Sequence, residues 1–260
     1  MLVNPAVEAP LEISTKVTDQ DRAEGVLDEW GVLYSKDGLR LLKGNKSLTV
    51  YTVRERTRVI CDEAFSWCGS LKTLNLPDGL KSIGDSAFSE CNSLKTLNLP
   101  AGLTSIGNSA FWECKSLETL NLPAGVKSIG NQAFYFCKSL ETLNLPAGLT
   151  SIGNDAFYYC TSLETLNLPD RVKSIGNQAF YYCESLETLN LPAGLSSIGD
   201  YAFFGCRSLE TLNLPDGVKS IGDSAFSFCY SLAALYIPQG TKSHFKQLLP
   251  SHYHSKLRTQ

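Results

Sequence analysis

The chain has 260 residues, 43% of them hydrophobic, and a formal net charge of −3 at pH 7. This length and apolar content suffice for one folded unit with a substantial core, and they exclude an intrinsically disordered chain. Because the 23 Lys and Arg residues are scattered without forming a basic stripe, we expect no nucleic-acid partner and no membrane insertion.

The N-terminal segment, residues 1–46, is predicted to cap the rest of the molecule. Its first part, Met1–Lys16, contains prolines and glutamates instead of the basic and then apolar stretch of an export signal. Further along, Trp30–Tyr34 and Leu39–Leu42 flank an Asp37-Gly38 pair, which is typical of a tight β turn. We therefore predict a β-hairpin cap within residues 1–46.

Residues 47–238 repeat with a period of 23. Cysteines and leucines recur at this step, and so does an Ala-Phe pair, without a single insertion. A fixed period of this length predicts a solenoid of stacked coils. The phenylalanines of the repeat are Phe65, Phe88, Phe111, Phe134, Phe157, Phe180, Phe203 and Phe226.

The first half of each coil is predicted to be a short β-strand. In the coil Ser139–Thr161, Leu143 and Leu145 alternate with Thr142 and Asn144, so the leucines are expected to face inward and the polar residues outward. A proline then ends the strand. One such strand per coil predicts a continuous parallel sheet along one face of the solenoid.

The second half of each coil is predicted to contain a short helical turn. Gly153 is expected to interrupt the chain, and Asn154 to cap the turn. Ala156, Phe157 and Cys160 follow at i, i+1 and i+4, a spacing that places all three on one buried face.

Residues 239–260 are predicted to form a C-terminal capping helix and tail. Thr241 is a candidate N-cap, Phe245 and Leu248 have helical spacing, and Pro250 interrupts the helix. The predicted fold is therefore an α/β solenoid, a right-handed superhelix of about eight 23-residue coils. Its parallel sheet lies on one face and its helical turns on the other, between a hairpin cap and a helical cap.

The nine cysteines do not have the spacing of a metal site. Eight of them follow the 23-residue step, and no C-x-x-C pair occurs. Stacked coils would bring neighbouring cysteines within the range of a disulfide, but pairing would distort a regular stack. We predict a ladder of buried free thiols.

No catalytic residues, metal ligands or cofactor are expected. All three histidines lie at the C-terminus, so no coil can combine a nucleophile with a histidine base. His252 and His254 form only a weak metal pair and are expected to be exposed in the tail. A row of carboxylates is interpreted as a solvated edge rather than an acid and a base with separated pKa values: Glu118, Glu141, Glu164, Glu187 and Glu210.

Aromatic residues next to each buried phenylalanine form the first candidate binding surface. The helical spacing turns them away from the interior, and a row of exposed aromatics is a common binding signal. Alternatively, each ring lies across its neighbour and shields the edge of the coil. The residues are Trp112, Tyr135, Phe136, Tyr158, Tyr159, Tyr181, Tyr182 and Phe204.

The outward face of the predicted strands is the second candidate. It repeats one threonine and one asparagine per coil, and the alternative interpretation is a pair of polar ladders that solvate the sheet. Because the aromatic positions vary between coils and the strand positions do not, the aromatic row is favoured. The strand residues are Thr119, Asn121, Thr142, Asn144, Thr165, Asn167, Thr188 and Asn190.

Nearly exact copies of L-x-x-L-x-L-P-x-G-L/V-x-S-I-G-x-x-A-F-x-x-C-x-S run from Ser70 to Tyr230. This pattern resembles the BspA-type, or treponemal-type, leucine-rich repeat. The resemblance implies a non-enzymatic adhesion or protein-binding module of a bacterial surface or secreted protein. It also implies a protein or glycan ligand, such as host matrix or another cell surface. A cytoplasmic interaction scaffold is the alternative, an enzyme a distant one, and the chain is expected to be a monomer.

Overall fold

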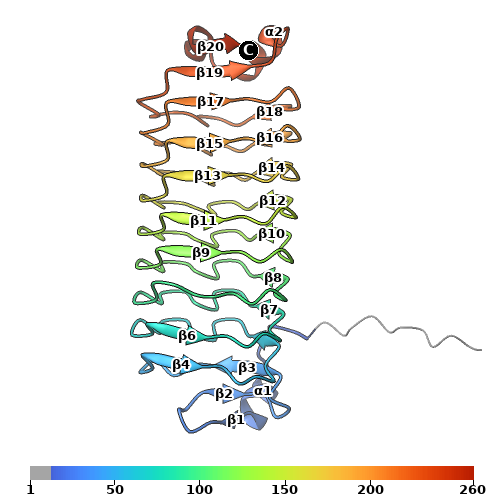
Figure 1. Cartoon of the computed structure of the whole chain (residues 1–260), viewed down its shortest axis with the longest axis vertical. Helices are drawn as coiled ribbons and strands as arrows, with labels where there is room; N and C mark the ends of the chain where they lie inside the picture. Colours follow the sequence, from blue (N-terminus) through green and yellow to red (C-terminus); the bar gives the residue numbers. More distant parts are fainter. Residues whose placement is uncertain (1–12) are drawn as a thin grey trace, which may run out of the picture.

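The computed structural model describes residues 13–260, which form a straight stack of coils closed by a cap at each end (Figure 1). Residues 1–12, which hold most of the segment expected to lack an export signal, lie outside the described residues. The solenoid has about ten stacked turns of about 23 residues, compared with about eight predicted. Part of the difference arises because both caps add strands to the stack.

The first sheet contains the strands predicted from the leucine pattern. In each Thr-Leu-Asn strand the leucine is buried, while the threonine and the asparagine are exposed. The sheet is not continuous: it divides into short groups, and Thr96 contributes only a bridge to Thr119. Its strands are β4 (Val50–Thr52), β6 (Thr73–Asn75), β9 (Thr119–Asn121), β11 (Thr142–Asn144), β13 (Thr165–Asn167), β15 (Thr188–Asn190), β17 (Thr211–Asn213), β19 (Ala234–Ile237) and β20 (Leu257–Thr259).

A second parallel strand per coil was not predicted. Except for Val59–Ile60 in the first coil, each is a Ser-Ile pair followed by a glycine. The isoleucine packs against the core, and the glycine N–H, as at Gly153, donates to the isoleucine carbonyl of the preceding coil, Ile129, at 3.0 Å. These strands are β5 (Val59–Ile60), β7 (Ser82–Ile83), β8 (Ser105–Ile106), β10 (Ser128–Ile129), β12 (Ser151–Ile152), β14 (Ser174–Ile175), β16 (Ser197–Ile198) and β18 (Ser220–Ile221).

The two sheets form two walls of the solenoid, and the segment after the second strand of each coil, such as residues 154–159, forms a third wall. This wall consists of turns, so the prediction of helical turns is wrong. Asp155 and Tyr159 adopt left-handed backbone conformations, with φ of 54° and 57°, which an α-helix cannot contain. The N–H groups of Asp155, Phe157 and Tyr159 donate to carbonyls of the next coil at 2.8–2.9 Å. The backbone of this wall is therefore hydrogen-bonded between coils rather than within a helix.

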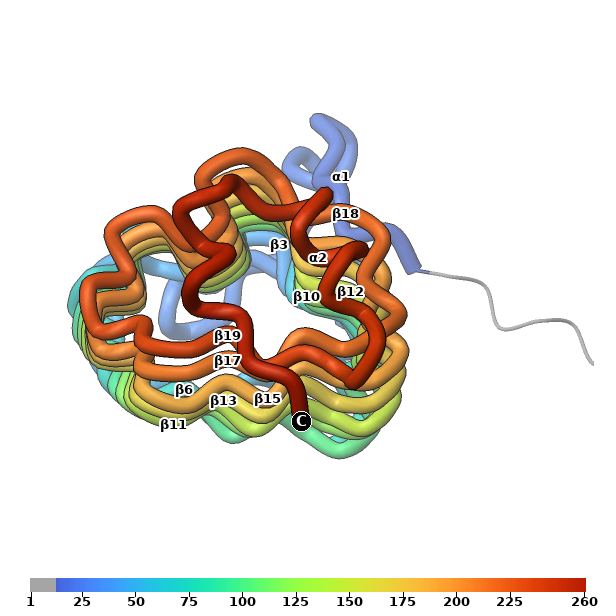
Figure 2. Tube along the Cα trace, turned by 90° about the horizontal axis from the view of Figure 1, so that it is seen from above, coloured from blue at the N-terminus to red at the C-terminus, as the bar shows by residue number. Residues whose placement is uncertain are grey.

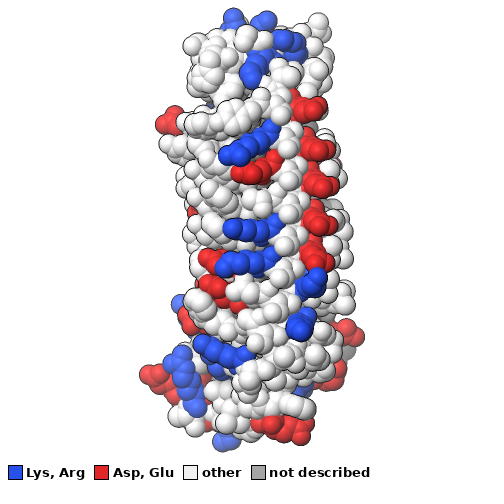
Figure 3. Space-filling model, turned by 90° about the vertical axis from the view of Figure 1, so that its left-hand side faces the viewer, with Lys and Arg blue, Asp and Glu red and all other residues white. Residues whose placement is uncertain are grey.

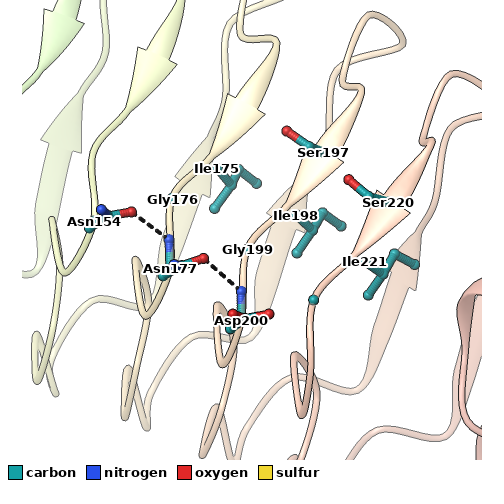
Figure 4. Close-up of a pocket in the computed structure, with 11 residues that line it drawn as sticks. Asn154, Ile175, Gly176, Asn177, Ser197, Ile198, Gly199, Asp200, Ser220 and Ile221 are labelled. Carbon is teal, nitrogen blue, oxygen red and sulfur yellow. Dashed lines mark hydrogen bonds between the residues drawn. The ribbon is translucent and has the colours of Figure 1, made fainter.

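Asn154 does not cap a helix but links one coil to the next. Its Oδ1 accepts the backbone N–H of Asn177 at 2.8 Å (Figure 4). Its own N–H donates to Oδ1 of Asn131 at 2.8 Å. Asp200 continues the ladder, because its Oδ1 accepts the N–H of Asp223 at 2.8 Å. This explains why Asn and Asp interchange at this position: both supply the same acceptor oxygen.

The glycine before this ladder is required by close packing between coils. A Cβ on Gly176 would lie 2.6 Å from the backbone N of Asn154 and 2.6 Å from the backbone C of Gly153. These are backbone atoms, which cannot move away as the end of a flexible side chain could. We expect Gly176→Ala to lower the free energy of unfolding in urea by about 1–3 kcal/mol. Gly69→Ala is the control, because its Cβ would have 3.8 Å to the nearest atom. Equal destabilisation by both variants would contradict this account.

Seen down the stack, the successive coils lie over one another (Figure 2). The core that they enclose contains a column of stacked phenylalanines. From Phe65 to Phe226, neighbouring ring centroids lie 5.2–5.7 Å apart and the rings are nearly parallel. Tyr51 covers one end of the column and Tyr253 the other, with centroids 6.4 and 6.1 Å away. Because every inner ring contacts two others, each coil depends on its neighbours for burial.

The N-terminal cap contains the predicted hairpin. Strands β2 (Leu33–Tyr34) and β3 (Arg40–Lys43) pair antiparallel, and β1 (Val26–Leu27) extends the sheet outward. On its other side β3 pairs parallel with β5, which joins the hairpin to the coils. Helix α1 (Asp19–Glu24) precedes the hairpin.

The C-terminal cap is more ordered than predicted. Helix α2 (Lys242–Leu248) ends before Pro250, as expected, but a 3₁₀ helix (Ser251–Lys256) and strand β20 follow it. Strand β20 pairs parallel with β19 and completes the stack. Tyr253 and Leu257 are buried against the last coil, so the segment expected to be a tail is part of the cap.

Candidate binding surfaces

The cysteines are held inside the solenoid as free thiols. All nine are buried, and from Cys91 to Cys229 each repeat thiol lies 3.0–3.3 Å from the carbonyl of the phenylalanine 26 residues earlier. Burial raises the pKa of Cys229 to about 12 and that of Cys61 to about 11. A thiol that stays protonated in the interior is neither a nucleophile nor a metal ligand.

Two of the three histidines contact backbone carbonyls at the C-terminal cap, whereas His252 is exposed, as predicted. Nε2 of His254 lies 3.0 Å from the carbonyls of both Lys246 and Leu249, and Nε2 of His244 lies 2.7 Å from the carbonyl of Val218. Within residues 13–260, no three His, Cys, Asp or Glu side chains are grouped as a metal site requires. In the same part of the chain, no helix has the length and apolar character needed to cross a bilayer.

Acidic side chains form a row along one edge of the solenoid (Figure 3). Glu141, Glu164, Glu187 and Glu210 are exposed, one per coil. Lys95 pairs with Glu118 at 2.8 Å, where the row begins. Exposed carboxylates with the same surroundings do not supply the separate acid and base that catalysis requires.

A shallow hollow of about 350 Å³ lies along the second sheet, beside the asparagine ladder (Figure 4). Ile175, Ile198 and Ile221 line it together with Ser197 and Asp200. One carboxylate beside hydroxyl groups, with neither histidine nor lysine in the lining, does not assemble an acid–base pair.

The eight aromatic residues of the first candidate surface form two stacked columns. The first aromatic column consists of Trp112, Tyr135, Tyr158, Tyr181 and Phe204. Its ring centroids are 6.0, 4.6, 4.7 and 4.8 Å apart in that order, and successive rings are within 9° of parallel. Each ring therefore covers the face of the next, which is the arrangement expected of rings that shield the coil edges.

The second aromatic column, Phe136, Tyr159 and Tyr182, runs beside the first. Its centroids are 4.8 and 5.0 Å apart. Rings of the same coil in the two columns are tilted by 35° to 65° and lie 4.9–5.1 Å apart. The turns of the third wall hold both columns in register, because the backbone hydrogen bonds between coils fix each ring relative to its neighbour.

The rings are half-buried, so their edges remain open to solvent. Partial burial raises the pKa of Tyr158 to about 12 and also raises the pKa of Tyr135 and Tyr181. No hydrogen bond within residues 13–260 uses the hydroxyl groups of the five tyrosines in the two columns. These hydroxyls are available to an external partner.

The aromatic surface extends beyond the residues singled out in the sequence. Gly205 takes the place of an aromatic in the second aromatic column, and the ring of Tyr182 lies over it. Phe228, at the same repeat position one coil later, is 51% exposed, and Tyr230 is 70% exposed. Phe228 was missed in the sequence, although alignment of the coils at the 23-residue step places it on this surface.

The threonine and asparagine surface lies on the first sheet, as predicted. All eight of its predicted residues are exposed. Nδ2 of Asn144 donates to Oδ1 of Asn121 at 2.5 Å, and Asn190 donates to Asn167 at 2.7 Å. The four asparagine side chains are therefore paired along the sheet as in a polar ladder, whereas the four threonine hydroxyls have no hydrogen bond within residues 13–260.

Comparisons with known proteins agree with this architecture. The model of the BspA type leucine-rich repeat region matches residues 58–187 and 150–249. A leucine-rich repeat protein of T. pallidum is 28% identical, with a TM-score of 0.54 over 88% of this chain and 94% of that one. A leucine-rich cell surface protein of Faecalibacterium prausnitzii is 22% identical, with a TM-score of 0.53 over 91% and 85%.

A leucine-rich repeat protein of Eubacterium ventriosum is 25% identical, with a TM-score of 0.55 over 79% of this chain and 50% of that one. Among curated proteins, none matches the sequence. The family model covers well over half of the 260 residues. The chain therefore belongs to the BspA-type leucine-rich repeat family.

Proposed function

We propose that this protein is a non-enzymatic binding module that holds a macromolecular partner on its two aromatic columns. The observation that carries the proposal is the row of half-buried rings with unpaired hydroxyls, extending over at least five coils. Aromatic side chains supply large contact area at a small entropic cost, since only two torsions are fixed on binding.

The strand surface is the weaker candidate because its asparagine side chains are already paired along the sheet. A partner there would have to replace hydrogen bonds such as that between Asn144 and Asn121. It would also meet the same two side chains in every coil, with little to distinguish one ligand from another. The aromatic positions differ between coils, and this variation supports selective recognition.

The proposed setting is the surface of a bacterium or the secreted fraction, with a protein or glycan of host matrix or of another cell as partner. Support for it comes from the family, whose members are often surface proteins. One solved structure of similar fold is described as a cell surface protein. An adhesion role fits a long, rigid surface that repeats one contact many times.

The test is binding of purified variants to an array of matrix proteins and glycans. We expect a variant with Tyr158→Ser, Tyr159→Ser, Tyr181→Ser and Tyr182→Ser to lose at least about tenfold in affinity for an array partner. The matched variant, Thr142→Lys with Thr165→Lys, alters the first sheet and should retain binding. Circular dichroism confirms that both are folded. Loss of binding only in the threonine variant would move the site to the first sheet.

A further inference from the structure

We infer that the partner contacts the aromatic columns through a segment in the polyproline II conformation. This inference rests on the proposed function and specifies the kind of chain that the surface accepts. Three features of the columns carry it: the covered ring faces, the spacing of the rings and the free hydroxyl groups.

The ring faces are not available for stacking against sugars. In the first aromatic column each inner ring has a parallel ring on both sides, with centroids 4.6–6.0 Å away. Planar contact with a pyranose needs an open face, and these columns present edges instead. Proline-rich segments, by contrast, are bound by surfaces lined with several aromatic side chains in known recognition modules.

The spacing of the rings matches one chain conformation. Tyr158 and Tyr181 lie 4.7 Å apart, so two steps of the column span about 9.4 Å. A polyproline II helix advances about 9.3 Å per turn of three residues. An α-helix advances about 5.4 Å per turn and would lose register by about 0.7 Å at each ring. A β-strand repeats its side chains every 6.6–6.8 Å, roughly one and a half steps, and does not fit either.

The hydrogen-bonding groups are complementary as well. A polyproline II segment makes no internal hydrogen bonds, so all its carbonyls need donors. Tyr135, Tyr158 and Tyr181 present hydroxyls without partners among residues 13–260, on nearly parallel rings whose centroids lie 4.6 and 4.7 Å apart. Proline has no N–H, which matches a surface that offers hydroxyl donors on three successive rings. The first aromatic column accommodates about six residues of such a segment.

The experiment measures binding of a ten-residue oligoproline by calorimetry, with a ten-residue Gly-Ser peptide and a linear glucose oligosaccharide as alternatives. The test variant carries Tyr135→Phe, Tyr158→Phe and Tyr181→Phe, which keeps the stacked rings and removes only the hydroxyls. Tyr236→Phe, on strand β19 of the first sheet, is the matched control. Of the three ligands, we expect only oligoproline to bind. Its affinity should fall about tenfold in the triple variant and stay unchanged in the control variant.

Absence of oligoproline binding, equal binding of the Gly-Ser peptide, or unchanged affinity in the triple variant would overturn the inference. So would binding of the oligosaccharide in place of oligoproline. These failures are distinct from failure of the proposed function. Suppose that the tyrosine-to-serine variant binds an array partner more weakly and that this partner contains no proline-rich segment. The proposed function then holds, and only the inference of a polyproline II segment is refuted.

Discussion

The protein is expected to lose stability steeply above about pH 9 and to unfold before about pH 11. The cause is the ladder of buried thiols. An exposed thiol has a reference pKa of 9.0, whereas burial raises the pKa of each repeat cysteine and brings that of Cys229 to about 12. Between these two pKa values, the thiols of the unfolded chain are ionised and those of the folded chain remain protonated.

The sign and the size of the effect follow from proton linkage. Below about pH 8 the thiols are protonated in both states and contribute almost no pH dependence. Above pH 9 the unfolded chain releases protons that the folded chain keeps, so the free energy of unfolding falls by about 1.4 kcal/mol per pH unit for each thiol. Over nine thiols the fall is on the order of 10 kcal/mol per unit, as large as the whole stability of a typical domain.

The measurement is urea unfolding, followed by circular dichroism between pH 7 and pH 10.5. A variant with Cys137→Ala, Cys160→Ala and Cys183→Ala is less stable at every pH, but its slope above pH 9 should be smaller by about a third. Burial also raises the pKa of Tyr34 and Tyr253, so these tyrosines act in the same direction above pH 10. An unfolding free energy that stays constant from pH 7 to pH 10 would show that the thiols are accessible in the folded protein.

The 23-residue period was enough to predict the stack and its inward side chains. Period-2 alternation around Leu143 identified the first strand, and the repeated Phe157 and Cys160 positions identified the core. The eight aromatic residues were recognised for the same reason, since they occupy fixed places relative to the buried phenylalanine. Side-chain periodicity carries this information because burial in a solenoid repeats with the coil.

The parts that could not be predicted depend on contacts between coils. A strand of two residues, such as Ser151–Ile152, is too short to show alternation, so the second sheet left no signal. The third wall has helix-like spacing of Ala156, Phe157 and Cys160, yet alternate N–H groups, such as that of Phe157, donate to carbonyls 22 positions later. The spacing of buried residues is the same in a helical turn and in a turn that bonds to the next coil. Only the left-handed φ angles of Asp155 and Tyr159 show that these turns are not helical.

Replacement of one central phenylalanine is expected to have the largest effect of any single substitution. Phe157 is fully buried, with Phe134 and Phe180 stacked on its two faces at 5.4 and 5.2 Å. We expect Phe157→Ala to lower the free energy of unfolding by about 3–5 kcal/mol, through lost burial and the cavity left behind. Thr165→Ala, on the exposed face of strand β13, is the control and should change it by less than about 0.5 kcal/mol.

The location of the damage separates a stacked core from independent coils. Because Phe134 and Phe180 each lose a ring contact, hydrogen exchange should increase in the coils on both sides of Phe157, while the end coils near Phe65 and Phe226 change least. If exchange increased only between Ser139 and Thr161, each coil would be stable by itself and the phenylalanine column would not couple them. Unchanged unfolding would place Phe157 outside the core and contradict the register of the third wall.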